Sequence, residues 1–294
     1  MRLSLLGAIS RSLFIAPAYV ASIWTLSHAL GKWDAMTIAS LLEPITGKPG
    51  PARLDDASDW MQGRTLYGGA SALVAFTMAQ RAFPDLPPLR AAQIGFVAPL
   101  GEDISLTAEI VRQGRNVTQV RSEIHNEKGV ALTAFWLFAA EREANARREA
   151  DAPETWPGEP EDNARAMEGQ GPSFIQNNFE IRFGQAKDED HGATIRRWAR
   201  LTEDHELDPV SKLVLMGDVM PPGAMRIMQR MGPISSINWS FNVLDAETRS
   251  KDGWYLAENA SQHADSGYSS ERLRMWDREG RQVIDGLQCV AVFG

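Results

Sequence analysis

RTLYGGASALVAFTMAQRA, residues 64–82, is the stretch from which the fold of this 294-residue chain can be worked out. After the pair Gly68-Gly69, residues 70–82 are rich in Ala, Leu, Val, Phe and Met and are apolar on nearly every side. A surface helix would carry a single apolar stripe, so this pattern predicts a buried helix. Pro84, followed by prolines at 87 and 88, ends the helix because proline cannot continue the hydrogen-bond ladder.

Strands follow this helix. Four runs of β-branched and aromatic residues, separated by turn residues, predict strands at 92–97, 104–111, 117–125 and 130–138. The sequence NEKG at 126–129 predicts a hairpin turn in which the glycine supplies a positive φ.

The second half repeats the scheme. Asp208 and Pro209 form a helix-start signal, a capping side chain followed by proline at the first helical position, and residues 210–216 continue as an apolar helix. The predicted strands of this half are 179–183, 194–201, 235–244, 254–262, 268–276 and 283–293.

The strand-rich ends of the two halves can be laid over one another. Residues 126–129 then fall on residues 277–280, Arg121 falls on Arg272, and Val117 falls on Tyr268. An internal repeat of this size indicates two copies of one unit, each a helix followed by antiparallel strands. We therefore predict an α+β double hotdog, in which two helix-plus-antiparallel-sheet repeats form one continuous or paired sheet.

Four parts are expected along the chain. They are an N-terminal extension (1–35), hotdog domain 1 (36–140), a polar linker rich in proline and glycine (141–173) and hotdog domain 2 (174–294). The extension fits a signal peptide or a membrane helix poorly, since Ser and His interrupt its apolar run. A leader upstream of a start at Met36, an export or membrane segment, and an extra helix stay open as interpretations.

Composition excludes several classes of protein. The net charge of −8 argues against a nucleic-acid binder, which relies on Lys and Arg. The single cysteine, Cys289, excludes an intramolecular disulfide framework and a multi-cysteine zinc site, and it favours a reducing, cytoplasmic setting. The sequence lacks G-x-S-x-G, H-E-x-x-H, G-x-G-x-x-G and P-loop motifs, so we expect no metal and no cofactor.

Four short pieces occur in order on the expected elements: RTLYGG (64–69), GDVMPP (217–222), SSINWS (235–240) and DGLQCV (285–290). With them, the chain from about residue 60 to 294 resembles the double-hotdog thioesterase superfamily and is similar to acyl-CoA thioesterase II. The resemblance implies hydrolysis of a fatty or related acyl-CoA by an activated water, without a covalent intermediate. It places the catalytic trio on Asp218, Ser236 and Gln288. Ser236 stands where threonine is more familiar, and Ala70 stands where thioesterase II often has glutamine.

These residue types suit the chemistry. A carboxylate can accept a proton from water, while a hydroxyl and an amide can hold that water in one direction. Backbone N–H groups at the helix start near Gly69 are candidate oxyanion donors. Substrate contacts are expected from Tyr67, Gly68, Gly69 and Trp239.

Simpler explanations exist for each residue. Asp218 beside two prolines also suits a turn, and the glycine pair also suits close approach of the helix to the sheet. Ser236 alternates with Asn238, Ser240 and Asn242, opposite Ile237, Trp239, Phe241 and Val243, as on a solvent-exposed strand. Gln288 lies in an apolar run and therefore needs a partner.

Two other functions stay open: an enoyl-CoA hydratase or dehydratase of the hotdog type, and an acyl-CoA-binding protein without catalysis. The resemblance implies acyl-CoA as the partner and a homo-oligomer, and we expect no stable membrane insertion.

Overall fold

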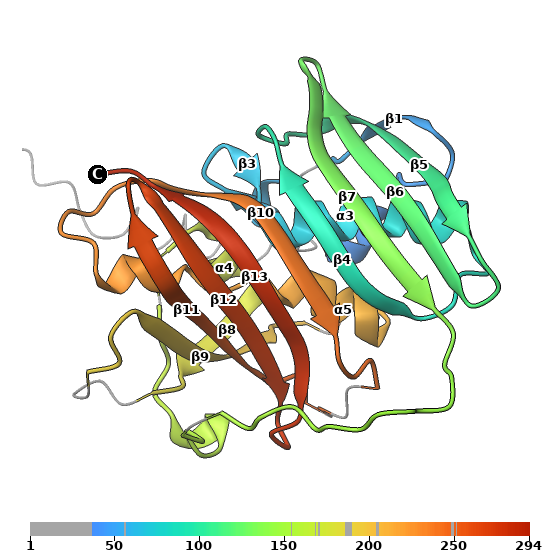
Figure 1. Cartoon of the computed structure of the whole chain (residues 1–294). Coiled ribbons are helices and arrows are strands. Elements are labelled where there is room, and N and C mark those ends of the chain that lie inside the picture. Colours follow the sequence, from blue (N-terminus) through green and yellow to red (C-terminus); the bar gives the residue numbers. More distant parts are fainter. Residues whose placement is uncertain are drawn as a thin grey trace, which may run out of the picture. The chain divides into compact units, whose positions relative to one another are not determined.

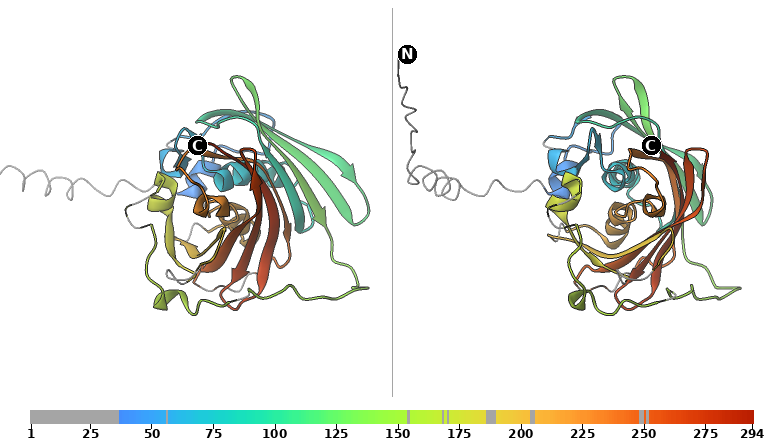
Figure 2. Two further views of the ribbon diagram at one scale, coloured as in Figure 1. Left: turned by 60° about the vertical axis from the view of Figure 1, so that its left-hand side comes forward. Right: turned by 90° about the vertical axis from the view of Figure 1, so that its left-hand side faces the viewer.

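One antiparallel sheet of eleven strands curves around two central helices (Figures 1 and 2). The computed structural model describes residues 37–294, except 56, 154, 168, 170, 186–189, 204–205, 248–249 and 251. The predicted extension 1–35 lies outside the described residues. None of the helices in the described part is long and apolar enough to span a membrane.

The strands follow the order β1-β5-β6-β7-β4-β10-β13-β12-β11-β9-β8 across the sheet. Those of the first half are β1 (Gly50–Arg53), β4 (Leu89–Phe96), β5 (Asp103–Gln113), β6 (Val117–Asn126) and β7 (Gly129–Ala139). Those of the second half are β8 (Phe179–Phe183), β9 (Thr194–Leu201), β10 (Ile234–Val243), β11 (Tyr255–Asp265), β12 (Tyr268–Asp277) and β13 (Gln282–Val292). The halves join through β4 and β10, where Ile94 pairs with Trp239. The predicted α+β hotdog architecture is confirmed, with one continuous sheet.

The core lies between the inner face of this sheet and the helices α3 (Gly68–Ala82) and α5 (Pro209–Met216). Every residue of α3 from Gly69 to Ala79 is buried, as its all-round apolar sequence predicts. At the start of α5, the Asp208 carboxylate accepts the N–H groups of Val210 and Ser211, both at 3.0 Å, so the predicted cap is confirmed.

Short elements complete the first half and the connections. They are α2 (Ile38–Leu42), the 3₁₀ turns η1 (Ala57–Trp60), η2 (Pro160–Asp162) and η3 (Gly223–Arg226), the ribbon β2 (Met61–Gln62) and β3 (Thr65–Leu66), and α4 (Ser173–Asn178). The Phe174 ring of α4 stacks on Tyr67 with centroids 4.1 Å apart, and it thereby covers the start of α3.

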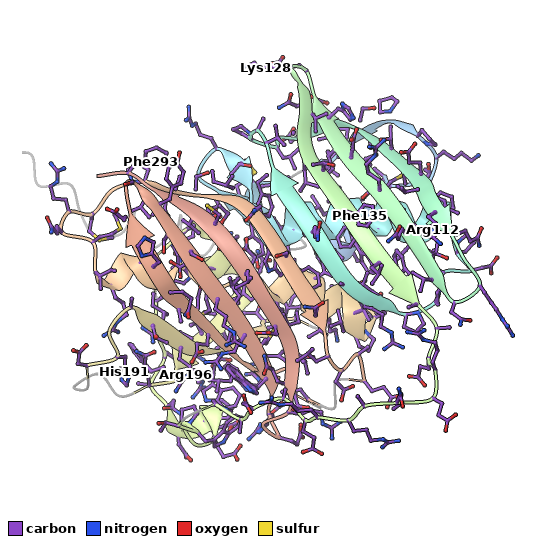
Figure 3. All side chains as sticks on the ribbon, in the orientation of Figure 1. Arg112, Lys128, Phe135, His191, Arg196 and Phe293 are labelled. Atoms are coloured by element: carbon purple, nitrogen blue, oxygen red, sulfur yellow. The ribbon has the colours of Figure 1, made fainter. Side chains whose placement is uncertain are left out.

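The segment between the halves runs past the lower ends of β12 and β13 (Figure 1). It contacts side chains on the outer face of the sheet, the face directed away from the helices. The Trp156 ring meets Trp198 edge-on at 5.2 Å, Trp276 donates its Nε1–H to Asp151 O, and Arg196 donates to Thr155 O. Figure 3 shows Arg196 in this region and Phe135 on the outer face of the first half. We keep the division into domains 36–140 and 174–294, with a linker at 141–173, as a proposal.

The glycine pair at the start of α3 serves a close helix–helix contact. A Cβ atom on Gly69 would lie 2.1 Å from Leu215 O of α5, and Tyr67 donates its hydroxyl to the same oxygen at 2.5 Å. The simpler expectation that these glycines let the helix approach the sheet is therefore wrong for Gly69, because its nearest obstacle is the backbone of α5.

We predict that Gly69→Ala destabilises the protein by at least about 2 kcal/mol, since a backbone carbonyl cannot move aside as a flexible side chain can. Urea unfolding would measure the loss. Gly101→Ala is the matched control, because nothing lies within 4 Å of a Cβ atom placed there. Equal stability of the two variants would contradict the close contact.

Candidate active site

A cavity of about 480 Å³ lies where the two halves meet, beside the first turn of α3. Its apolar wall includes Leu66, Phe96 and Leu100 from the first half, Phe174 and Ile175 from α4, and Met220 and Met225 from the chain after α5. Its polar lining comes from Gln62, Thr65, Ser71, Asp218, Ser235, Ser236 and Gln288. The structure therefore brings the three predicted catalytic residues to one cavity.

Asp218 and Gln288 are in direct contact. Asp218 lies two residues beyond the end of α5, and its Oδ1 accepts a hydrogen bond of 2.8 Å from Gln288 Nε2. Gln288 is 4% exposed on the inner face of β13, so the partner that its apolar surroundings required is this carboxylate. The amide oxygen of Gln288 accepts no hydrogen bond from the residues that the structure describes and is available to a water in the cavity.

The other carboxylate oxygen of Asp218 lies against the start of α3. A Cβ atom on Gly68 would be 2.1 Å from Asp218 Oδ2, so any larger residue would push the carboxylate out of this position. The first hydrogen bond of α3 joins Ser71 N to Tyr67 O, which leaves the N–H groups of Gly68, Gly69 and Ala70 without partners inside the helix. These N–H groups and the helix dipole favour negative charge here.

Burial decides the titration of this acid. It raises the pKa of Asp218 from 3.8 to about 7, although the hydrogen bond from Gln288 acts in the opposite direction. Burial, and secondly the charge of Asp218, raise the pKa of Tyr67 well above 10, so its hydroxyl stays protonated and keeps its bond to Leu215 O. An acid with a pKa near 7 is suited to accept a proton at neutral pH.

Ser236 reaches the cavity through a β-bulge. The pairing of β10 with β13 shifts between Ser236, opposite Val290, and Asn238, opposite Cys289. The bulge reverses the alternation of side chains, so Ser236 lines the cavity while Ile237 is 42% exposed. The expected alternation, with Ser236 on the face of Asn238 and Ile237 on the face of Trp239, is therefore wrong at this point. No described residue forms a hydrogen bond with the Ser236 hydroxyl.

The predicted substrate-binding residues divide into two groups. Gly68 lines the cavity, whereas Tyr67, Gly69 and Trp239 are buried behind its wall. Trp239 is 0% exposed, and a Cβ atom on Gly217 would lie 2.5 Å from its ring. The structure places these three residues in the packing that supports the site.

Sequence reasoning missed most of the apolar wall, because its residues come from segments far apart in the chain. Phe174 and Ile175 follow directly after the predicted linker, and no local pattern set them apart from ordinary core residues. In the part of the chain that the structure describes, no three His, Cys, Asp or Glu residues are grouped so as to hold a metal ion.

Comparison with known families accounts for both halves. The profile of the acyl-CoA thioesterase N-terminal domain matches residues 56–139, and that of the acyl-CoA thioesterase C-terminal domain matches residues 148–292. No curated protein matches the chain in a sequence search.

Solved structures share the fold at low sequence identity. A Thermobifida fusca protein assigned provisionally as a thioesterase II has a TM-score of 0.74 at 18% identity, covering 88% of this chain and 98% of that chain. A hotdog protein of unknown function from Alicyclobacillus acidocaldarius has a TM-score of 0.73 at 20% identity, covering 85% and 97%. An acyl-CoA thioesterase II from Mycobacterium marinum has a TM-score of 0.66 at 15% identity, covering 87% and 98%.

At these identities the solved structures show the fold alone, and the family assignment rests on the two profiles. Together they match residues 56–139 and 148–292, well over half of the chain. The chain belongs to the acyl-CoA thioesterase family.

Proposed function

We propose that this protein hydrolyses the thioester of a fatty or related acyl-CoA, with Asp218 as the general base. The observation that carries the proposal is the buried Asp218–Gln288 pair, joined at 2.8 Å inside a mostly apolar cavity. A carboxylate without a cation partner, held in a cavity, is typical of a catalytic group.

In the proposed reaction, a water bound between Asp218, Ser236 and Gln288 attacks the thioester carbonyl carbon. Asp218 accepts a proton from that water as the new C–O bond forms. The tetrahedral intermediate then collapses, the C–S bond breaks, and the proton on Asp218 passes to the departing CoA thiolate. The products are the free acid and CoA, and Asp218 returns to its ionised form.

Donors for the developing oxyanion are available at the start of α3. The N–H groups of Gly68, Gly69 and Ala70 have no partners inside the helix, and Gly68 lines the cavity. A donor of this kind contributes roughly 100- to 1000-fold to the rate.

The cavity lining supports hydrolysis over hydration of an enoyl-CoA. Hydration of the double bond needs a histidine or a second acid, and the described lining residues contain neither beside Asp218. The apolar wall of Phe96, Phe174, Ile175 and Met220 suits an acyl chain. A homo-oligomer and a cytoplasmic location stay predictions from the sequence.

The direct test is thiol release over a panel of acyl-CoA chain lengths. We expect the wild type to release CoA thiol, and Asp218→Asn to lower kcat at least 100-fold because the amide cannot accept the proton. Asp208→Asn is the matched control, since asparagine caps a helix as well as aspartate and the residue lies at the far end of α5.

Unchanged turnover in Asp218→Asn would remove the acid from the mechanism. Binding of acyl-CoA without thiol release would favour the non-catalytic alternative. Loss of conjugated-thioester absorbance from an enoyl-CoA would favour the hydratase.

Stability should change in the opposite direction to activity. The pKa of Asp218 is 3.8 in the unfolded chain and about 7 in the folded one, so the folded state binds this proton more tightly. The free energy of unfolding of the wild type therefore decreases as the pH rises from about 4 to about 7. Asp218→Asn does not titrate, so we expect it to be more stable than the wild type by about 4 kcal/mol at pH 8, since each pKa unit corresponds to about 1.4 kcal/mol. Urea unfolding at pH 8 and pH 4 checks this, and a gain of the same size at both pH values would contradict it.

The pH dependence of kcat/KM should report the same carboxyl group. With a pKa of about 7 and the ionised form active, kcat/KM should fall tenfold per pH unit below 7 and level off above it. In Gln288→Leu the donor that lowers this pKa is lost, so the acidic limb of the curve, where kcat/KM falls with decreasing pH, should move to higher pH. The constant value of kcat/KM at high pH should fall about 10- to 100-fold.

Gln282→Leu is the control for that experiment. Gln282 is a buried glutamine on the same strand, it donates to Ile284 O, and it does not line the cavity. A limb that stays in place in Gln288→Leu would show that this amide does not act on the titrating group.

A further inference from the structure

A second carboxylate, that of Glu271, is buried near the cavity and has no part in the proposed reaction. Glu271 is 0% exposed on the inner face of β12. Its Oε2 accepts the N–H of Gly223 at 2.8 Å, and its Oε1 accepts the N–H of Ala224 at 3.2 Å and the Ser269 hydroxyl at 2.5 Å. No Lys or Arg among the described residues forms an ion pair with it, so its buried oxygens are satisfied by these hydrogen bonds.

The backbone that Glu271 holds is the end of the segment that carries Asp218. This segment leaves α5 at Gly217, passes Asp218 and two prolines, and ends in η3 at Gly223. Pro221 and Pro222 have no N–H groups, so they cannot tie the segment down through their own backbone donors. One end is fixed by the hydrogen bonds from Gly217 N to Leu213 O and from Val219 N to Met216 O, and the other end, beyond the prolines, is bound by Glu271.

The other half of the protein shows that the fold does not require an acid here. The overlay that puts Val117 on Tyr268 puts Val120 on Glu271. In the sheet, Val120 pairs with Trp136, whereas Glu271 pairs with Gln288. Val120 and Trp136 are both fully buried. The same place in the first hairpin is therefore ordinary core, and only the half that carries Asp218 has a carboxylate there.

We propose that Glu271 is a positioning residue, which fixes residues 218–224 so that the Asp218 carboxylate is held against Gln288 and the start of α3. The proposal rests on the hydrolysis proposed above. Glu271 does not line the cavity, so it acts through Asp218 and not on the substrate. A displacement of about 1 Å in a reacting group can lower a rate on the order of 100-fold.

Kinetics of Glu271→Gln test this role. Glutamine has one acceptor oxygen where glutamate has two. Its NH₂ group would therefore face an N–H or O–H group that now donates a hydrogen bond to the carboxylate. We expect kcat to fall about 30-fold. The double variant Glu271→Gln with Asp218→Asn should be no slower than Asp218→Asn alone, because both changes act on the same step.

Two comparisons separate positioning from general stability. Glu258→Gln is the matched control, because Glu258 is also buried but lies on the outer face of β11, bound to Arg196 and Arg274. It should lose stability and keep kcat per folded molecule. Ser269→Ala, which removes one donor to Glu271, is a milder second variant in case Glu271→Gln does not fold. It should lower kcat about threefold, again with no added effect on Asp218→Asn.

Amide hydrogen exchange gives a readout that does not depend on activity. Gly223 and Ala224 should exchange faster in Glu271→Gln and in Ser269→Ala, but not in Glu258→Gln. If exchange is unchanged, or if the effect on kcat adds to that of Asp218→Asn, the positioning role is overturned. If exchange rises but the wild type releases no thiol, the proposed hydrolysis fails while the anchor remains.

Discussion

The missing Cβ atoms of Gly68 and Gly69 set the distance between α3 and the end of α5, and the site depends on that distance. A methyl group on Gly69 would strike Leu215 O, and one on Gly68 would strike the Asp218 carboxylate. Without them, the backbone of α5 comes close enough for Tyr67 to bind Leu215 O. Asp218, three residues after Leu215, therefore lies at the first turn of α3, where N–H groups without partners inside the helix favour negative charge.

The two buried carboxylates differ in how many donors they receive. Glu271 accepts three hydrogen bonds from described residues, whereas Asp218 accepts one, from Gln288. Burial costs a carboxylate less when donors replace the lost water. Asp218, which accepts fewer hydrogen bonds, is the acid beside the cavity, and burial raises its pKa to about 7. The same shortage that lowers the stability of the fold makes Asp218 a suitable base at neutral pH.

The sequence predicted most of the architecture because its strands and helices follow simple patterns. The strands predicted at 179–183 and 194–201 have the bounds of β8 and β9, and the Asp-Pro signal correctly predicts the Asp208 cap. Two features of the site could not be predicted from the sequence. The bulge after Ser236 breaks the period of two without any proline or glycine to mark it. Trp239 was expected at the substrate, but aromatic side chains on a strand look alike whether they face a ligand or a neighbouring glycine such as Gly217. Tertiary packing decides both, and spacing along the chain does not encode it.

The two repeats contribute different parts of the candidate site. In the first half, Ser122 donates to Ala75 O of α3 and accepts the Trp136 Nε1–H, so the polar atoms of this hairpin hold the sheet to α3. In the second half, the corresponding strands β12 and β13 hold the segment at 218–224 through Glu271 and Gln288. Each hairpin thus ties the sheet to the central segment beneath it. The first repeat fixes the helix whose N–H groups face the acid, and the second fixes the acid itself, so neither repeat could form this site without the other.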